Sequence, residues 1–315
     1  MLTGVVSTTT PQNRPVAVSE EQFVTTSDGI DLCFQTFGDP ADEAALLIMG
    51  LGGPMTWWDP DFCILLASKG FFVIRYDNRD TGKSSKVRHR IRRPDVIKAF
   101  LGRPVDAPYT LSTMGQDALA ILDELGIERA HVCGVSMGGM IAQTLAIEHP
   151  DRVASLVSIM STTGARQVGY QDAKLFPALL AKRLDGRDGY VEHSAQFWKK
   201  IASPAYPGDP ASARIRAGET FDRGFSAGGV MRQMVAVLSA PNRTTALKRL
   251  RLPVAVIHGL NDRMVHVSGG RATARAIPGS ELVLMPGMGH DMPPALFPQI
   301  AAVVRRTANR AKRQP

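Results

Sequence analysis

Residues 134–139 have the sequence Gly134-Val135-Ser136-Met137-Gly138-Gly139. It follows the apolar run His131–Val135 and precedes the helical run 140–145, which places a serine on a tight turn between a buried strand and a helix. Such a turn strains the backbone of the serine, and glycine at 134 and 138 removes side chains that would collide there. The pattern predicts an exposed nucleophile at the N-terminus of a helix.

Further runs of strand length flank this stretch and alternate with helical patterns. The runs that indicate strands buried on both faces are Ala44–Met49, Phe71–Arg75, His131–Val135, Val153–Met160, Pro253–His258 and Glu281–Met285. Two earlier runs, Phe23–Thr26 and Ile30–Phe37, are joined by Ser27-Asp28-Gly29, which is typical of a hairpin. The sequence therefore predicts an α/β fold with a mostly parallel, eight-stranded sheet that opens with antiparallel strands and is flanked by helices.

Composition limits the class of protein. The chain has 315 residues, of which 44% are hydrophobic, and three cysteines. It contains no apolar run of membrane-spanning length and no secretory signal at its beginning, so we expect a cytoplasmic protein. Cys33, Cys63 and Cys133 stand in apolar stretches, and we expect them to be buried in a reducing compartment, forming neither a disulfide framework nor a metal site.

A serine nucleophile needs a histidine to remove its proton and an acid to orient that histidine. His290 lies in a glycine-rich loop after the last strand run, where it can reach Ser136. Asp262 follows the run Pro253–His258, at the same edge of the sheet. Asp291 is the rival acid, but it adjoins His290 and precedes two prolines, where a helix-capping role is natural. We favour Asp262.

An oxyanion formed on attack by the serine would need backbone N–H donors. Met137 is the residue after the nucleophile, and Leu51 lies in a glycine-rich loop after the run Ala44–Met49, so these two N–H groups are the candidates. Trp57 and Trp58 stand close by and are either substrate-pocket residues or ordinary core. No cluster of residues has metal-ligand spacing, and the chemistry needs no metal or organic cofactor.

The chain resembles the α/β-hydrolase superfamily of serine esterases and lipases from about residue 22 to 307. The segments that carry the resemblance are Met49–Gly53, Arg75–Ser84, Gly134–Gly139, His258–Asp262 and Pro286–His290. The Arg75–Ser84 segment is especially similar to the bacterial group that includes aclacinomycin methylesterase. The resemblance implies that Ser136, Asp262 and His290 form a catalytic triad and that the Leu51 and Met137 N–H groups form the oxyanion hole.

The expected organisation has five parts. They are a flexible N-terminal arm (1–21), the first part of the hydrolase core (22–163), a helical cap (164–246), the second part of the core (247–307) and a basic C-terminal tail (308–315). The cap region contains no strand pattern and is rich in leucine, methionine and phenylalanine, including Leu175, Phe176, Leu179, Phe197, Phe221, Phe225 and Met231. Met231 is a further candidate for the pocket, and such a cap favours an apolar substrate.

These features predict a carboxylic ester hydrolase that forms an acyl-enzyme on Ser136 and acts on a small-molecule ester. The same residues would also serve a thioesterase, a phospholipase, a perhydrolase or a carbon–carbon bond hydrolase. A non-catalytic ligand-binding protein on the same scaffold is a further alternative.

The net charge of +8 is concentrated in two segments. Residues 83–103 contain eight basic residues and one acidic residue, and the tail from Arg305 contains five basic residues. No nucleic-acid-binding motif accompanies either segment, so we expect no nucleic-acid partner. The first segment is interpreted as a solvated loop or, alternatively, as a contact with an anionic membrane surface, since Val96, Ile97, Phe100 and Leu101 lie within it.

Overall fold

The computed structural model describes residues 16–175 and 186–312. Its centre is one eight-stranded sheet in the order β1-β2-β4-β3-β5-β6-β7-β8. The strands are β1 (Gln22–Thr25), β2 (Asp31–Phe37), β3 (Glu43–Ile48), β4 (Phe71–Tyr76), β5 (Ala130–Val135), β6 (Val153–Ile159), β7 (Val254–Gly259) and β8 (Glu281–Met285). Pairings β1–β2 and β2–β4 are antiparallel and all others are parallel, which confirms the predicted fold class and the opening hairpin.

Nearly all residues of the central strands are buried, as their continuous apolar runs require. Every residue of β4, β5 and β7 is buried. In a parallel sheet both faces are covered by the helices that connect the strands, so these strands have no polar face. The helices that the sequence predicts between the strands cover these faces.

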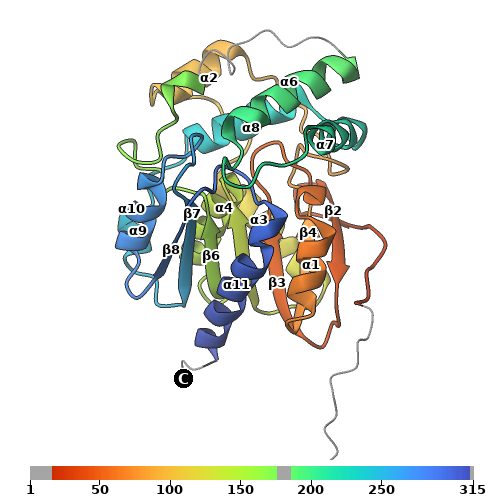
Figure 1. Cartoon of the computed structure of the whole chain (residues 1–315), viewed down its shortest axis with the longest axis vertical. Coiled ribbons are helices and arrows are strands. Elements are labelled where there is room, and N and C mark those ends of the chain that lie inside the picture. The colour runs from red at the N-terminus through yellow and green to blue at the C-terminus, as the bar shows by residue number, and fades with distance from the viewer. Residues whose placement is uncertain (1–15, 176–185, 313–315) are drawn as a thin grey trace, which may run out of the picture.

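Helices pack on both faces of the sheet (Figure 1). The helices are α1 (Pro60–Ala67), α2 (Arg93–Phe100), α3 (Leu111–Glu124), α4 (Met137–Glu148), α6 (Gly186–Ile201), α7 (Pro210–Asp222), α8 (Ala227–Leu238), α9 (Thr244–Leu247), α10 (Ser268–Ala276) and α11 (Phe297–Ala311). Helices α3, α4 and α10 bury their apolar sides in one core cluster, and α1 and α11 bury theirs in the other.

The region between β6 and β7 is helical in its described part. Helices α6, α7 and α8 lie over one end of the sheet, and α2 lies beside them (Figure 1). Two of the apolar residues expected in the cap, Phe176 and Leu179, lie outside the described residues. In the described chain no helix combines the length and the apolar character that a membrane span requires.

Both ends of the described chain pack against the sheet. Residues 1–15 of the predicted N-terminal arm lie outside the described residues, but Ser19 N–H donates to Thr36 O in β2 at 3.0 Å. At the other end α11 continues to Ala311, and Ala308 is fully buried. The helix therefore includes residues that the sequence analysis assigned to the tail.

The three cysteines are buried, which confirms the expected burial. Burial raises the pKa of the Cys63 thiol to about 12, so it stays protonated and behaves as an apolar group.

Candidate active site

Ser136 occupies the turn between β5 and α4. Its φ of 55° lies in the left-handed region, which is strained for a residue with a side chain. A Cβ at position 134 would lie 2.1 Å from the carbonyl oxygen of Gly138, and a Cβ at position 138 would lie 2.0 Å from that of Ile48. Both positions therefore require glycine, and the turn is pressed against the end of β3.

His290 and Asp262 approach Ser136 from the loops after β8 and β7. Nδ1 of His290 lies 2.8 Å from Oδ2 of Asp262, and Nε2 lies 3.1 Å from Oγ of Ser136. Because an ionised carboxylate only accepts hydrogen bonds, Nδ1 carries the ring proton and Nε2 can accept one from the serine hydroxyl. The structure thus brings together the three side chains that the sequence analysis selected.

Asp262 is buried, and both of its oxygens are hydrogen-bonded. Oδ1 accepts from the N–H groups of Met264 and Val265, both at 2.9 Å. Oδ2 accepts from His290, and Nε2 of His258 lies 3.4 Å from it. Burial acts to raise the pKa of Asp262, but the charges and hydrogen bonds of His290 and His258 outweigh burial and lower this pKa below its ordinary value. The carboxylate therefore stays ionised opposite His290.

Asp291 has a different set of contacts. Its Oδ1 accepts from the N–H of Ser203 at 2.8 Å and from the Ser203 hydroxyl. Ser203 follows α6 and its Oγ accepts from Gly289 N–H at 2.8 Å, so this cluster joins the cap to the loop of His290. The expected capping role of Asp291 is wrong, because no side chain caps the short helix at Pro294–Leu296.

The loop after β3 lies directly against the serine. A Cβ at position 50 would come within 3.3 Å of the Cβ of Ser136. The N–H groups of Leu51 and Met137 have no acceptor in the part of the chain that the structure describes. Both groups are therefore free to bind a ligand.

Two side chains that the sequence analysis did not select hold this loop. Nδ2 of Asn78 donates to the carbonyl oxygen of Met49 at 3.0 Å. Oε1 of Gln233, a fully buried residue of α8, accepts from the N–H of Gly52 at 2.8 Å. The only local signal for Gln233 was a polar residue within the apolar pattern 231–238. That signal does not identify its partner.

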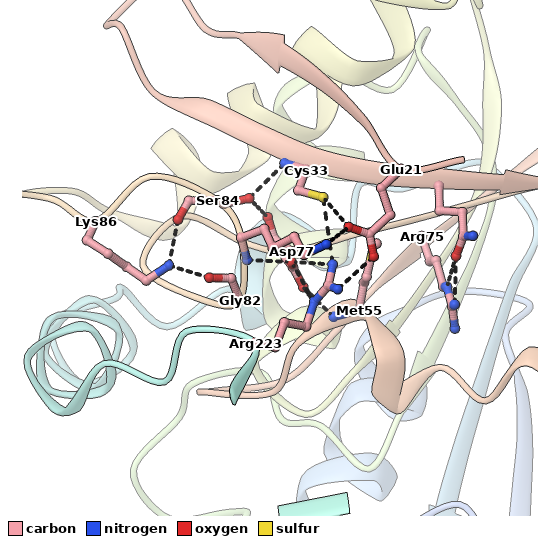
Figure 2. A network of polar contacts seen from close by, with 11 residues as sticks. Glu21, Cys33, Met55, Arg75, Asp77, Gly82, Ser84, Lys86 and Arg223 are labelled. Carbon is pink, nitrogen blue, oxygen red and sulfur yellow. Dashed lines mark hydrogen bonds and ion pairs between the residues drawn. The ribbon is translucent and has the colours of Figure 1, made fainter. Parts of the chain in front are cut away.

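Asp77 connects the same loop to the cap (Figure 2). Its Oδ1 accepts from the N–H of Met55 at 2.7 Å, and its Oδ2 lies 2.8 Å from Nη2 of Arg223, the residue after α7. Arg223 also pairs with Glu21 at 2.7 Å. A Cβ at Gly82 would lie 2.2 Å from the Asp77 carboxylate, so this position has room only for glycine. The fully buried carboxylate of Asp77 is therefore paired with a cation of the cap and with a backbone N–H near the loop after β3.

The three predicted pocket residues have different surroundings. Trp58 is fully buried in the core cluster that α1 covers, which favours the alternative of an ordinary core residue. Trp57 is half-buried, and its Nε1 donates to Oγ1 of Thr220 in α7 at 2.9 Å. Met231 is half-buried on α8. Within the described chain the ring N–H of Trp57 is thus bonded to the cap, whereas the ring N–H of Trp58 has no hydrogen-bond partner.

Metal ligands do not gather in the described residues. Across 16–175 and 186–312, no group of three or more His, Cys, Asp or Glu side chains is arranged to hold a metal ion. The described site consists of a serine, a histidine, a carboxylate and free backbone N–H groups.

This combination of sheet, strained serine and His–Asp pair defines a class of protein, the enzymes with an alpha/beta hydrolase fold. The family of that description matches residues 46–293. The chain belongs to this family.

Among the relatives of the chain are a methylesterase and an enol-lactonase. The chain is 30% identical to rhodomycin D methylesterase of Streptomyces peucetius over 89% of its own length and 95% of that protein. It is 28% identical to 3-oxoadipate enol-lactonase 2 of Acinetobacter baylyi, over 89% of this chain and 96% of the relative. A crystal structure of a hydrolase from Pseudomonas aeruginosa matches with a TM-score of 0.67 and 25% identity, over 92% of this chain and 97% of that one.

Replacing Arg223 by Met should destabilise the fold. The substitution leaves the buried Asp77 carboxylate without its cation, and breaking such a pair typically costs about 3–5 kcal/mol. We expect the free energy of unfolding in urea to fall by about this amount. Adding Asp77→Asn to Arg223→Met should recover part of the loss, because the unpaired charge is then gone.

Arg187→Met is the matched control. It removes the ion pair of Arg187 with Asp222 at the same end of α7, where both side chains are half exposed, and exposed pairs contribute less than about 1 kcal/mol. Equal losses in the Arg187 and Arg223 variants would contradict the role assigned to burial.

Proposed function

We propose that this protein hydrolyses carboxylic esters of apolar substrates through an acyl-enzyme on Ser136. The observation that carries the proposal is the continuous hydrogen-bonded chain from Asp262 through His290 to Ser136. That chain is arranged to make a serine hydroxyl nucleophilic, because His290 has its free Nε2 directed at the hydroxyl proton.

The reaction then follows two steps. Ser136 attacks the ester carbonyl while His290 takes its proton, and the ionised Asp262 stabilises the imidazolium that results. The Leu51 and Met137 N–H groups bind the oxyanion of the tetrahedral intermediate, which collapses when His290 protonates the leaving alcohol. Water, activated by His290, releases the acid and restores the serine. This sequence uses no metal or organic cofactor.

The relatives support an ester-type bond as the target. A methylesterase and an enol-lactonase both act at an acyl–oxygen bond by their names. Thioester, phospholipid, perhydrolase and carbon–carbon bond reactions would use the same three side chains, and comparing kcat/KM over p-nitrophenyl esters, thioesters and phospholipids distinguishes them. The apolar residues of the cap favour apolar acyl or alcohol groups.

A fluorophosphonate probe should label Ser136 covalently. The activated hydroxyl displaces fluoride from phosphorus, and peptide mass spectrometry should find the adduct on the peptide that contains Ser136. The Ser136→Ala variant should show no labelling. Absence of an adduct in the wild-type protein, or an equal adduct in Ser136→Ala, would refute the serine mechanism and favour a non-catalytic ligand-binding protein.

Replacing Asp262 by Asn should lower kcat by about 10³-fold or more, because an amide stabilises the wrong ring tautomer of His290 and does not stabilise its positive charge. Asp291→Asn is the matched control, since Asp291 contacts Ser203 rather than the ring. We expect it to retain kcat within about tenfold and to lower thermal stability. The reverse ranking of the two variants in ester hydrolysis would transfer the acid role to Asp291.

Gln233 should affect kcat because it holds the loop that contains Leu51. Its Nε2 donates to Arg79 O at 2.9 Å and Thr81 Oγ1 at 2.8 Å, which holds Oε1 against the N–H of Gly52. Gln233→Met keeps the size of the side chain and removes all three bonds. We expect kcat to fall about 10- to 100-fold with KM nearly constant, since a displaced donor weakens binding of the oxyanion rather than of the substrate.

The control for Gln233→Met is Thr81→Val, which removes a buried hydrogen bond of the same cluster but leaves the bond to Gly52. Both variants should lower the melting temperature, and only Gln233→Met should weaken inhibition by a trifluoromethyl ketone, whose adduct carries the oxyanion. Equal kcat values for the two variants would exclude a positioning role for Gln233.

A further inference from the structure

Helix α2 exposes a stripe of large apolar side chains. Ile97 and Phe100 lie in the helix and Leu101 is its C-cap residue, and their spacing i, i+3, i+4 places them on one side. They are 59%, 56% and 57% exposed. They account for three of the ten exposed large hydrophobic residues in the described chain. Exposure of three such residues side by side marks an interaction surface rather than ordinary scatter.

The opposite side of α2 is already occupied. Ala99 is buried, and α2 packs against α8 of the cap. In Figure 1 the helix lies at the end of the molecule opposite the C-terminus, beyond the cap. The stripe is therefore a free outer face of a docked helix, and a partner can reach it without displacing any described element.

Six cations of the segment 88–103 lie close to the stripe in the sequence. They are Arg88, Arg90, Arg92, Arg93, Lys98 and Arg103, and no ion pair within the described chain involves them. Asp95, the acidic residue of this segment, accepts from the N–H of Arg92 at 2.9 Å at the start of the helix. The other two cations of the segment differ, because Lys83 pairs with Glu21 and Lys86 donates to two carbonyl oxygens.

We infer that these six cations and three apolar side chains, here called the α2 surface, bind the surface of an anionic phospholipid bilayer. Cations attract anionic headgroups while a short apolar stripe enters the boundary between headgroups and acyl chains, and each contribution is weak without the other. Such binding is a function beyond ester hydrolysis. It would bring the cap end of the protein to a source of apolar esters.

Charge argues against a second copy of the chain as the occupant. A symmetric contact through the α2 surface would place six unpaired cations of one protomer against the same six of the other. An anionic bilayer supplies the opposite charge and an apolar phase together.

The test is binding to vesicles, measured by sedimentation without any turnover. The protein should bind vesicles of equal parts phosphatidylglycerol and phosphatidylcholine, with binding weakened by salt, and should not bind phosphatidylcholine alone. Arg88→Gln, Arg90→Gln, Arg92→Gln and Arg93→Gln combined should weaken binding about 100-fold. Ile97→Ser, Phe100→Ser and Leu101→Ser combined should also abolish sedimentation while leaving hydrolysis of a soluble ester unchanged.

The control variant neutralises four exposed cations at α9 and α10, Lys248, Arg249, Arg271 and Arg275, with the same change in net charge. It should bind vesicles almost as the wild type does. A second readout is the fluorescence of a polarity-sensitive dye on an introduced cysteine, which can be labelled selectively because the native cysteines are buried. The emission of the dye on Phe100→Cys should shift to the blue when anionic vesicles are added, and that of the dye on Arg249→Cys should not.

Three results would overturn the inference. They are no binding to anionic vesicles at low salt, equal loss of binding in the control variant, and a dimer in solution that the three serine substitutions dissociate. Binding to DNA in place of vesicles, dependent on the same arginines, would also refute it. Each result is independent of ester hydrolysis, so failure here leaves the proposed function standing.

Discussion

Two backbones meet at the turn of Ser136, and the rest of the structure depends on that contact. β3 and β5 are parallel neighbours with Ile48 opposite Gly134, so the loop after β3 and the turn after β5 leave the sheet side by side. Gly138 then passes so close to the Ile48 carbonyl that no Cβ fits between them. At this turn Ser136 has a strained φ of 55°, and α4 begins at the next residue. The loop that contains Leu51 lies against the nucleophile, since a Cβ at position 50 would come within 3.3 Å of the Ser136 Cβ.

A loop held this closely needs partners for its own polar groups. The loop after β3 has no sheet or helix to supply them, and buried backbone groups without partners are costly. Asn78, Asp77 and Gln233 provide hydrogen bonds to Met49, Met55 and Gly52. Because Gln233 and the cation paired with Asp77 come from the cap, the cap is part of the scaffold of the site and not only a cover over it.

The sequence predicted those features whose cause is local. Continuous apolar runs indicated six of the eight strands, and the Asp28-Gly29 turn indicated the two strands of the opening hairpin. The glycine spacing around Ser136 selected the nucleophile turn. His290 and Asp262 could be selected because each follows a strand that ends at the same edge of the sheet. Gln233 and Arg223 could not, since their partners lie 181 and 146 residues away and no pattern records such a pairing. The roles of Trp57 and Trp58 could not be predicted either, because adjacent residues of the same type have different surroundings in the fold.

Two basic segments that look alike in the sequence differ in the structure for a physical reason. In the C-terminal segment, Arg305 and Lys312 both pair with Glu43, and Arg306 pairs with Glu281, so three of its cations have an acidic partner where α11 packs against the sheet. Around α2, six cations form no ion pair within the part of the chain that the structure describes. Contact with water alone would account for the unpaired cations. It does not account for the exposed apolar side chains near them, because exposing apolar surface to water is unfavourable. A surface that is both cationic and apolar is best matched by a phase that is both anionic and apolar.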